Sequence, residues 1–212
     1  MNNIRNFSSA DFTALCDRLA EKDKDLHKVI LQFGYPPLWG RSASFATLIH
    51  IILEQQVSLA SAKAAFLKLE AFVGAITPEN VLAMTDEQMK ACYFSRQKMV
   101  YARHLAAAIM QGEFNLESLA ELEDDDLRTT MKKLKGIGDW TTDVFMMMVL
   151  HRCDCFPTGD IALVKSTKEV KNLPADTGKA AILAIADDWR PYRTIAAFIL
   201  WHAYIKKRNI IF

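Results

Sequence analysis

Apolar residues recur along this chain at the three- and four-residue spacing of amphipathic helices. In the stretch DFTALCDRLAEKD, for example, Phe12, Leu15 and Leu19 fall on one helical face. Later helical stretches follow a residue that can cap a helix and end at a glycine that can terminate one, as Ser58 and Gly74 illustrate. Strong strand signals are missing. The pattern therefore predicts an all-α fold.

Composition narrows the class of protein. Of the 212 residues 51% are apolar, which is enough for a core, and the length suits one compact domain or two small lobes. Polar residues interrupt every apolar run before it reaches membrane-spanning length, and the start MNNIRNFSSADF has no secretory apolar region. The four cysteines have the spacing of neither a zinc site nor an iron–sulfur cluster. These features predict an intracellular chain with reduced thiols.

The charge balance argues against a general nucleic-acid binder. The 26 basic and 25 acidic residues give a net charge of +1, and such binders are usually more basic. The basic clusters at 132–135 and 206–208 fit solvated faces. Any DNA contact must therefore come from local geometry.

One segment offers such a geometry. The sequence MKKLKGIGDWTTDVFMMMVL reads as a helix, a tight turn and a second helix, and Gly136 and Gly138 permit backbone angles that a side chain would forbid. The first amide N–H groups after the turn lack partners within the helix, so they favour an anion such as a DNA phosphate. Many helix corners also use glycines, so the turn alone favours a structural role over DNA binding.

The longer context of this turn carries a resemblance. From Leu134 to Leu163 the chain resembles the helix–hairpin–helix, Gly/Pro-rich loop and aspartate of the HhH-GPD DNA glycosylases, and it is most similar to their 3-methyladenine DNA glycosylase II (AlkA-like) group. Three further segments, which together extend the resemblance over roughly Phe45 to Trp201, are IILEQQVSLASA, FSRQKMVYARHLA and WRPYRTIAAFILW. Four motifs in family order are far more specific than any one of them.

The resemblance implies a two-lobed helical fold. The turn-rich stretch at 33–42 and the loop RCDCFPTGD mark the two crossing points of the chain. We therefore expect one lobe from residues 1–41 plus 152–212, and a second from 42–151 that ends in the helix–hairpin–helix at about 123–151.

The catalytic aspartate of the family corresponds to Asp160. An N-glycosidic bond breaks through an oxocarbenium-like sugar, which a nearby carboxylate stabilises, and the same group can position or deprotonate the attacking water. Asp160 could also simply cap the following helix. Relatives often carry an acid immediately before this aspartate, whereas this chain has Gly159.

The residue two positions after Gly138 separates two reaction types. Bifunctional members of the superfamily carry a nucleophilic lysine there, which forms a Schiff base and leads to strand nicking. This chain has Trp140, and Lys135 lies before the turn. The resemblance therefore implies a monofunctional enzyme that leaves an abasic site, needs no cofactor and carries no iron–sulfur cluster.

Further site residues follow from the same resemblance. Aromatic walls suit a flipped cationic purine, and the candidates are Trp140, Trp201 and Tyr192, with Trp39 and Tyr35 as weaker ones; core packing is an equal alternative for Trp201. The candidate DNA-binding residues are Gln55, Gln56, Ser58, Gly136, Ile137, Gly138 and Thr141. In the family, one residue of this segment enters the duplex and fills the space that the flipped base leaves, and Gln56 holds that position. Glu54 stands where relatives usually have glycine, which bears on the geometry of this loop. Backbone carbonyls of Leu134, Gly136 and Ile137 are candidate ligands of a monovalent cation at the hairpin.

The sequence thus favours a monofunctional glycosylase for alkylated purines that acts in base excision repair. The alternatives are a glycosylase for another base lesion and a non-catalytic helix–hairpin–helix DNA-binding protein. The expected partner is damaged double-stranded DNA, without membrane attachment, and the expected state is a monomer. Such an enzyme would work in the cytoplasm or nucleoid, or in the nucleus of a eukaryote.

Overall fold

A computed structural model describes residues 5–210, and within this range the chain is built from helices. The helices are α1 (Ser9–Lys22), α2 (Lys24–Phe33), α3 (Phe45–Glu54), α4 (Leu59–Val73), α5 (Pro78–Ala83), α6 (Asp86–Ala91), α7 (Arg96–Met110), η1 (Glu117–Glu121), α8 (Asp124–Lys132), α9 (Asp139–Met148), α10 (Ile161–Val170), α11 (Lys179–Asp187) and α12 (Arg193–Lys207). The extended pairing in this range is one isolated bridge between Asn6 and Arg152. The predicted all-α fold is confirmed.

Two compact units make up the described chain. The residues up to Gly40 and those from Met146 onward form one, here called the terminal unit, and Arg41–Phe145 form the other, the central unit. The second division falls inside α9, earlier than the loop that the sequence suggested. None of the helices in residues 5–210 is long and apolar enough to cross a bilayer.

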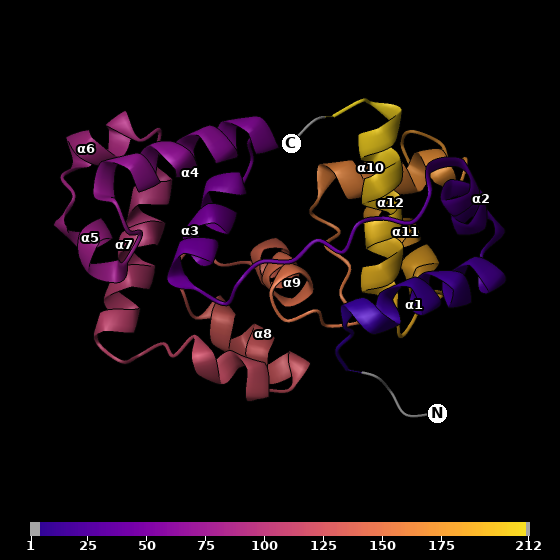
Figure 1. The fold of residues 1–212 in the computed structure, drawn as a ribbon, viewed down its shortest axis with the longest axis horizontal. Helices are drawn as coiled ribbons and strands as arrows, with labels where there is room; N and C mark the ends of the chain where they lie inside the picture. The colour runs from indigo at the N-terminus through magenta and orange to yellow at the C-terminus, as the bar shows by residue number, and fades with distance from the viewer. Residues whose placement is uncertain (1–4, 211–212) are drawn as a thin grey trace. The chain divides into compact units, whose positions relative to one another are not determined.

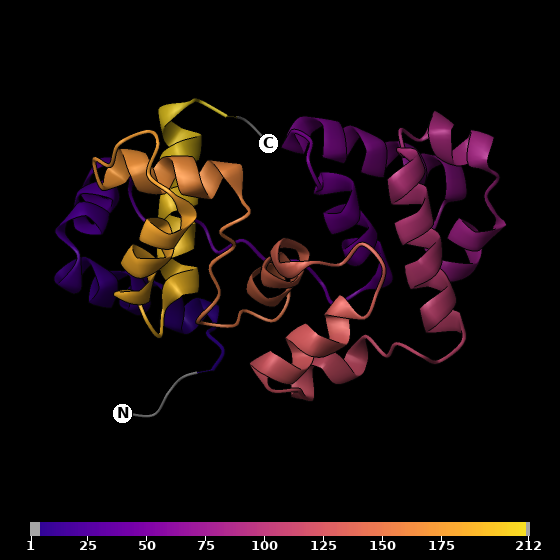
Figure 2. The ribbon, with the colours of Figure 1, turned by 180° about the vertical axis from the view of Figure 1, so that it is seen from behind.

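Helix α12 is the core of the terminal unit. An unbroken run from Thr194 to Ala203 is buried, because α1, α2 and α10 pack against different sides of this helix. Figure 1 shows α12 among these neighbours, and the reverse view in Figure 2 shows α10 and α11 in front of it. Asp160 directly precedes α10, and α10 packs against the buried helix α12, so the core of the unit fixes the position of Asp160.

The central unit packs around α3 and α7. Eight of the ten residues of α3 are buried, and α4 and α7 both contact this helix. Helices α5 and α6 cover α7 from outside (Figure 1). The predicted limits of α4 are confirmed, since the Ser58 hydroxyl accepts the Ser61 N–H at 3.2 Å and Gly74 ends the helix with a φ of 75°.

Candidate functional site

Asp160 caps α10 and is fixed by two donors. Its backbone N–H donates to the Pro157 carbonyl at 2.9 Å, which closes the loop before the helix. Its Oδ1 accepts the Leu163 N–H at 2.8 Å and the Trp201 Nε1–H at 3.1 Å. The carboxylate is half-buried. The helix-capping interpretation is thus correct for the geometry, and a carboxylate with a fixed orientation is also what a catalytic role needs.

Trp201 is part of the packed core and also contacts Asp160, so it combines the two alternatives, core packing and a place at the site, that the sequence left open. Its side chain is only 9% exposed, stacks on Phe198 with ring centroids 5.9 Å apart, and meets Trp39 edge-on at 6.5 Å. Its indole N–H nevertheless points at Asp160. Trp201 is therefore a packed residue whose edge belongs to the site. Trp39, a weaker candidate from the sequence, lies in the same aromatic group.

Tyr192 lies elsewhere in the terminal unit. It precedes α12, nine residues before Trp201, which corresponds to roughly 13 Å along a helix axis. Its hydroxyl accepts a hydrogen bond from the Arg18 guanidinium at 2.9 Å. Tyr192 is thus fixed against α1 at the N-terminal end of α12, whereas Trp201 lies near the middle of that helix, and a role for Tyr192 in the base pocket stays a prediction.

In the central unit, the two glycines of the hairpin have different roles. Gly136 has a φ of +86°, and a Cβ there would lie 2.1 Å from the Tyr101 ring, so only glycine fits. Gly138 is exposed, and a Cβ there would meet no atom within 4 Å. Gly136 is therefore required by packing against α7, whereas Gly138 leaves an open surface at the start of α9.

Two of the candidate DNA-binding residues of the hairpin have buried side chains. Ile137 is 5% exposed and Thr141 is 2% exposed. The Thr141 hydroxyl accepts a hydrogen bond from the Gln55 side chain at 2.9 Å. These side chains hold the hairpin in the central unit, and the exposed residues of the turn are Lys135, Gly138 and Asp139.

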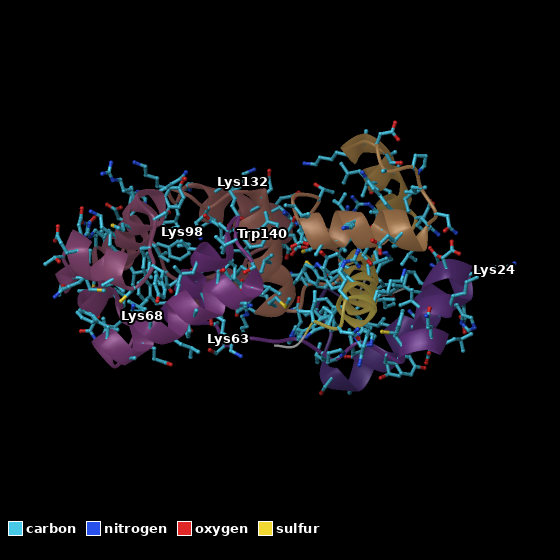
Figure 3. The ribbon with its side chains drawn as sticks, turned by 90° about the horizontal axis from the view of Figure 1, so that it is seen from above. Lys24, Lys63, Lys68, Lys98, Lys132 and Trp140 are labelled. Carbon is cyan, nitrogen blue, oxygen red and sulfur yellow. The ribbon has the colours of Figure 1, made fainter. Side chains whose placement is uncertain are left out.

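Trp140 is the second residue of α9 and is half-buried (Figure 3). The residue that distinguishes the bifunctional enzymes is therefore an aromatic one in the first turn of a helix. Lys135 lies before the turn, where its backbone N–H donates to His104 Nδ1 at 3.4 Å.

The segment after α3 differs from the expectation in detail. Gln55 donates from Nε2 to the Gly136 carbonyl and to Thr141 Oγ1, each at 2.9 Å, so its amide is used inside the central unit. Ser58 caps α4. Gln56 and Ser58 are both exposed, but the Ser58 hydroxyl is used by the helix cap, whereas Gln56 has a φ of 58° and lies in the loop itself.

Two of the three carbonyls that are candidate cation ligands also accept hydrogen bonds. The Gly136 carbonyl accepts the Gln55 amide, and the Leu134 carbonyl accepts the Ile137 N–H at 3.1 Å. Each carbonyl oxygen has a second lone pair, so a monovalent cation at the hairpin stays a prediction. Across the described part of the chain, no group of three His, Cys, Asp or Glu residues is arranged to hold a metal ion.

Three supporting residues were not identified from the sequence. Lys98 on α7 donates to the Leu53 carbonyl at 2.7 Å (Figure 3), and burial lowers the pKa of its ammonium group. Arg41 makes two hydrogen bonds, of 3.0 and 2.6 Å, to the carboxylate of the buried Glu54. Tyr101 packs on Gly136. Lys98 and Tyr101 lie one turn apart within the motif segment FSRQKMVYARHLA, and that spacing was the available signal.

Comparison with known proteins identifies the family. Residues 49–191 match the family described as HhH-GPD superfamily base excision DNA repair protein. DNA-3-methyladenine glycosylase 1 of Schizosaccharomyces pombe is 28% identical over 187 residues, which cover 86% of this chain and 82% of that protein. A putative DNA-3-methyladenine glycosylase of Bacillus subtilis is 29% identical over 126 residues, covering 59% of this chain. That match spans only 44% of the Bacillus protein.

A solved structure agrees with the sequence comparison. The S. pombe 3-methyladenine DNA glycosylase Mag1, in complex with abasic DNA, superposes with a TM-score of 0.83 at 27% identity. The alignment covers 89% of this chain and 95% of that one. The resemblance noted from four sequence motifs is confirmed. Since the family match extends over well more than half of the residues, the chain belongs to the HhH-GPD superfamily of base excision DNA repair proteins.

Proposed function

We propose that this protein is a monofunctional DNA glycosylase that flips alkylated purines of the 3-methyladenine type out of the duplex and hydrolyses their N-glycosidic bond. The observation that carries the proposal is the Asp160 carboxylate, which the Leu163 amide and the Trp201 indole hold in one orientation. Relatives from S. pombe and B. subtilis that are named for this activity support the substrate class.

The chemistry assigns one carboxylate two tasks. As the bond between C1′ and the base nitrogen breaks, its electron pair leaves with the base and positive charge develops on the sugar. The Asp160 carboxylate stabilises that charge and accepts a proton from the water whose oxygen bonds to C1′. An alkylated purine is already cationic, so it departs as a neutral base without a general acid. The products are the free base and an abasic site.

The aromatic surroundings suit this substrate. Ring faces attract cations, and the half-buried Trp39 packs edge-on against Trp201, whose indole donates to the carboxylate. The assignment of Trp140 to the base pocket remains a prediction based on residue type and position. Its tryptophan side chain has no amine that could form a Schiff base, which supports the monofunctional assignment.

DNA binding is assigned to the hairpin backbone. The amide N–H groups at the start of α9 and the open position at Gly138 suit a phosphate, which carries no sequence information. Damaged double-stranded DNA is therefore the proposed partner. A monovalent cation held by the carbonyls of Leu134, Gly136 and Ile137 stays a prediction.

The proposal is tested by incubating the protein with methylated and with unmethylated duplex DNA. We expect release of free methylated purines from the first only, with abasic sites that break on heating in alkali. Borohydride added during the reaction should trap no protein–DNA adduct. Release of no base from any methylated duplex would contradict the glycosylase assignment. A trapped adduct would contradict only the monofunctional one.

A further inference from the structure

Gln56 has a backbone conformation that its neighbours must maintain. Its φ of 58° lies in the left-handed region, which non-glycine residues rarely adopt. Such a conformation persists only where the surrounding structure determines it, and it is common where a side chain must be presented for function. Gln56 is exposed, so its own side chain is not what holds it.

The three residues before Gln56 are each held by a different part of the central unit. The Leu53 carbonyl accepts the Lys98 ammonium from α7 at 2.7 Å. The Glu54 carboxylate, only 8% exposed, pairs with Arg41 at 3.0 and 2.6 Å. The buried glutamate is thus accommodated by an ion pair with the partly exposed Arg41.

The third residue, Gln55, connects this segment to the hairpin. Its amide donates to the Gly136 carbonyl and to the Thr141 hydroxyl, and these acceptors lie on either side of the turn. Both acceptors are rigid, because the Tyr101 ring packs directly on Gly136 and Thr141 is buried. The position of the Gln55 side chain is therefore set by the hairpin.

We propose that Gln55 is a positioning residue that couples the hairpin to Gln56, so that a hairpin seated on phosphate holds Gln56 ready to enter the duplex. The inference rests on the proposed glycosylase function. If Gln55 has this role, extraction of the base from the duplex depends on the Gln55 amide, whereas breaking of the glycosidic bond does not. If Gln55 only packed, its loss would slow both steps alike.

The test compares Gln55→Ala and Gln55→Glu with Gln32→Ala, an exposed glutamine on α2. Glutamate keeps the shape of Gln55 but replaces the donor by a carboxylate that faces the Gly136 carbonyl. Single-turnover base release is measured on two duplexes, one with the lesion fully paired and one with the lesion opposite a mismatched base. The mismatch lowers the free energy needed to extract the base.

We expect both Gln55 variants to release the paired lesion about tenfold more slowly or worse, the loss typical of a hydrogen bond left unmade. On the mismatched lesion the deficit should fall to within about threefold of wild type. The Gln32→Ala variant should match wild type on both duplexes. Equal deficits on the two duplexes, or none on either, would overturn the coupling.

A second measurement uses the protein without DNA. Amide hydrogen exchange at residues 55–58 should accelerate in both Gln55 variants, while the urea midpoint stays near that of wild type. Unchanged exchange in this loop would contradict the positioning role. Because this measurement needs no activity, failure of the inference can be distinguished from failure of the proposed function, which would appear as a wild-type protein that releases no base.

Discussion

The terminal unit contains two aspartates with nearly the same local structure and different surroundings. Asp160 caps α10 and accepts the Trp201 indole N–H. Asp23 caps α2 and accepts the Trp189 indole N–H at 2.7 Å. Asp23, however, also pairs with Lys171 at 2.9 and 3.0 Å. A cap bonded to a tryptophan is thus a structural unit that the fold uses twice.

The surroundings of Asp23 indicate a structural role. Burial raises the pKa of Asp23, but the hydrogen bonds from Trp189 and Lys171 outweigh this effect, so the pKa lies below its ordinary value. A polar cavity of about 310 Å³ lies here, lined in part by Lys24, Asp25 and Lys171. A cavity and a perturbed carboxyl would suggest a functional site, yet the ion pair neutralises the charge that a cationic sugar would need.

The comparison teaches that the capping geometry alone does not identify the functional aspartate. What distinguishes Asp160 is its place after the hairpin and the Gly/Pro-rich loop, within the family match at residues 49–191. If the assignment is correct, matched substitutions at the two aspartates should separate activity from stability.

The largest effect is expected for Asp160→Asn. The amide oxygen of asparagine can still accept from Leu163 and Trp201, so the cap should survive while the negative charge is lost. We expect single-turnover release of a methylated purine to fall about a hundredfold or more. Asp23→Asn is the matched control and should release the base at close to the wild-type rate. Equal rates for wild type and Asp160→Asn would break the distinction between the two sites.

Asp23→Asn should instead lower stability. Removing the charge weakens the interaction with Lys171, although Asp25 remains a partner at 3.0 Å. We expect the free energy of unfolding to fall by about 2 kcal/mol, as for other hydrogen bonds to charged groups. Urea denaturation followed by circular dichroism measures this difference. A loss of the same size in Asp160→Asn would show that both aspartates serve mainly as caps.

Substitution of each tryptophan should affect the same property, activity or stability, as substitution of the aspartate that it contacts. Phenylalanine keeps much of the packing but removes the indole donor. Trp201→Phe should slow base release by about tenfold, because the carboxylate loses one of its orienting hydrogen bonds, and Trp189→Phe should lower stability by about 1 kcal/mol. Parallel kinetic and urea measurements on both variants test this. The pattern would be contradicted if Trp189→Phe were the slower enzyme.

The contribution of Asp23 to folding stability should become smaller in acid, and this is the smallest of the expected effects. Because its folded pKa is lowered, Asp23 contributes stability above its unfolded pKa of about 3.9 and loses that contribution as pH falls through the folded value. The stability difference between wild type and Asp23→Asn should therefore shrink between pH 6 and pH 3. Urea midpoints at the two pH values measure it, and a difference that grew in acid would contradict the assigned direction.

Local sequence patterns predicted the helices and several of their caps well. Ser58 and Gly74 bound α4 as expected, and Asp160 has both the capping geometry and the family position that the sequence indicated. These features depend on a few neighbouring residues. The contact of Tyr192 with Arg18 could not be predicted in this way, because residue type and motif membership do not reveal which neighbouring helix a side chain meets.

The supporting contacts could not be predicted in the same way. Gln55 reaches Gly136, and Lys98 reaches Leu53, across long stretches of sequence. Such hydrogen bonds arise from the packing of helices whose contact faces are apolar, so the positions of the polar residues at their edges follow only once the helices are placed. The pairing of Glu54 with Arg41, in the segment before α3, is a further contact that the sequence pattern does not reveal.

The central claim is that a fixed, negative Asp160 meets positive charge on the sugar, and this can be measured without turnover. Two duplexes are compared, one with a neutral tetrahydrofuran abasic site and one with a pyrrolidine site whose protonated nitrogen imitates the charged sugar. A group that stabilises the transition state binds such a mimic more tightly than its neutral counterpart. Wild type and Asp23→Asn should prefer the cationic duplex by about tenfold or more, and Asp160→Asn should lose that preference while it still binds the neutral duplex. A preference that survives in Asp160→Asn, or that wild type lacks, would contradict the account.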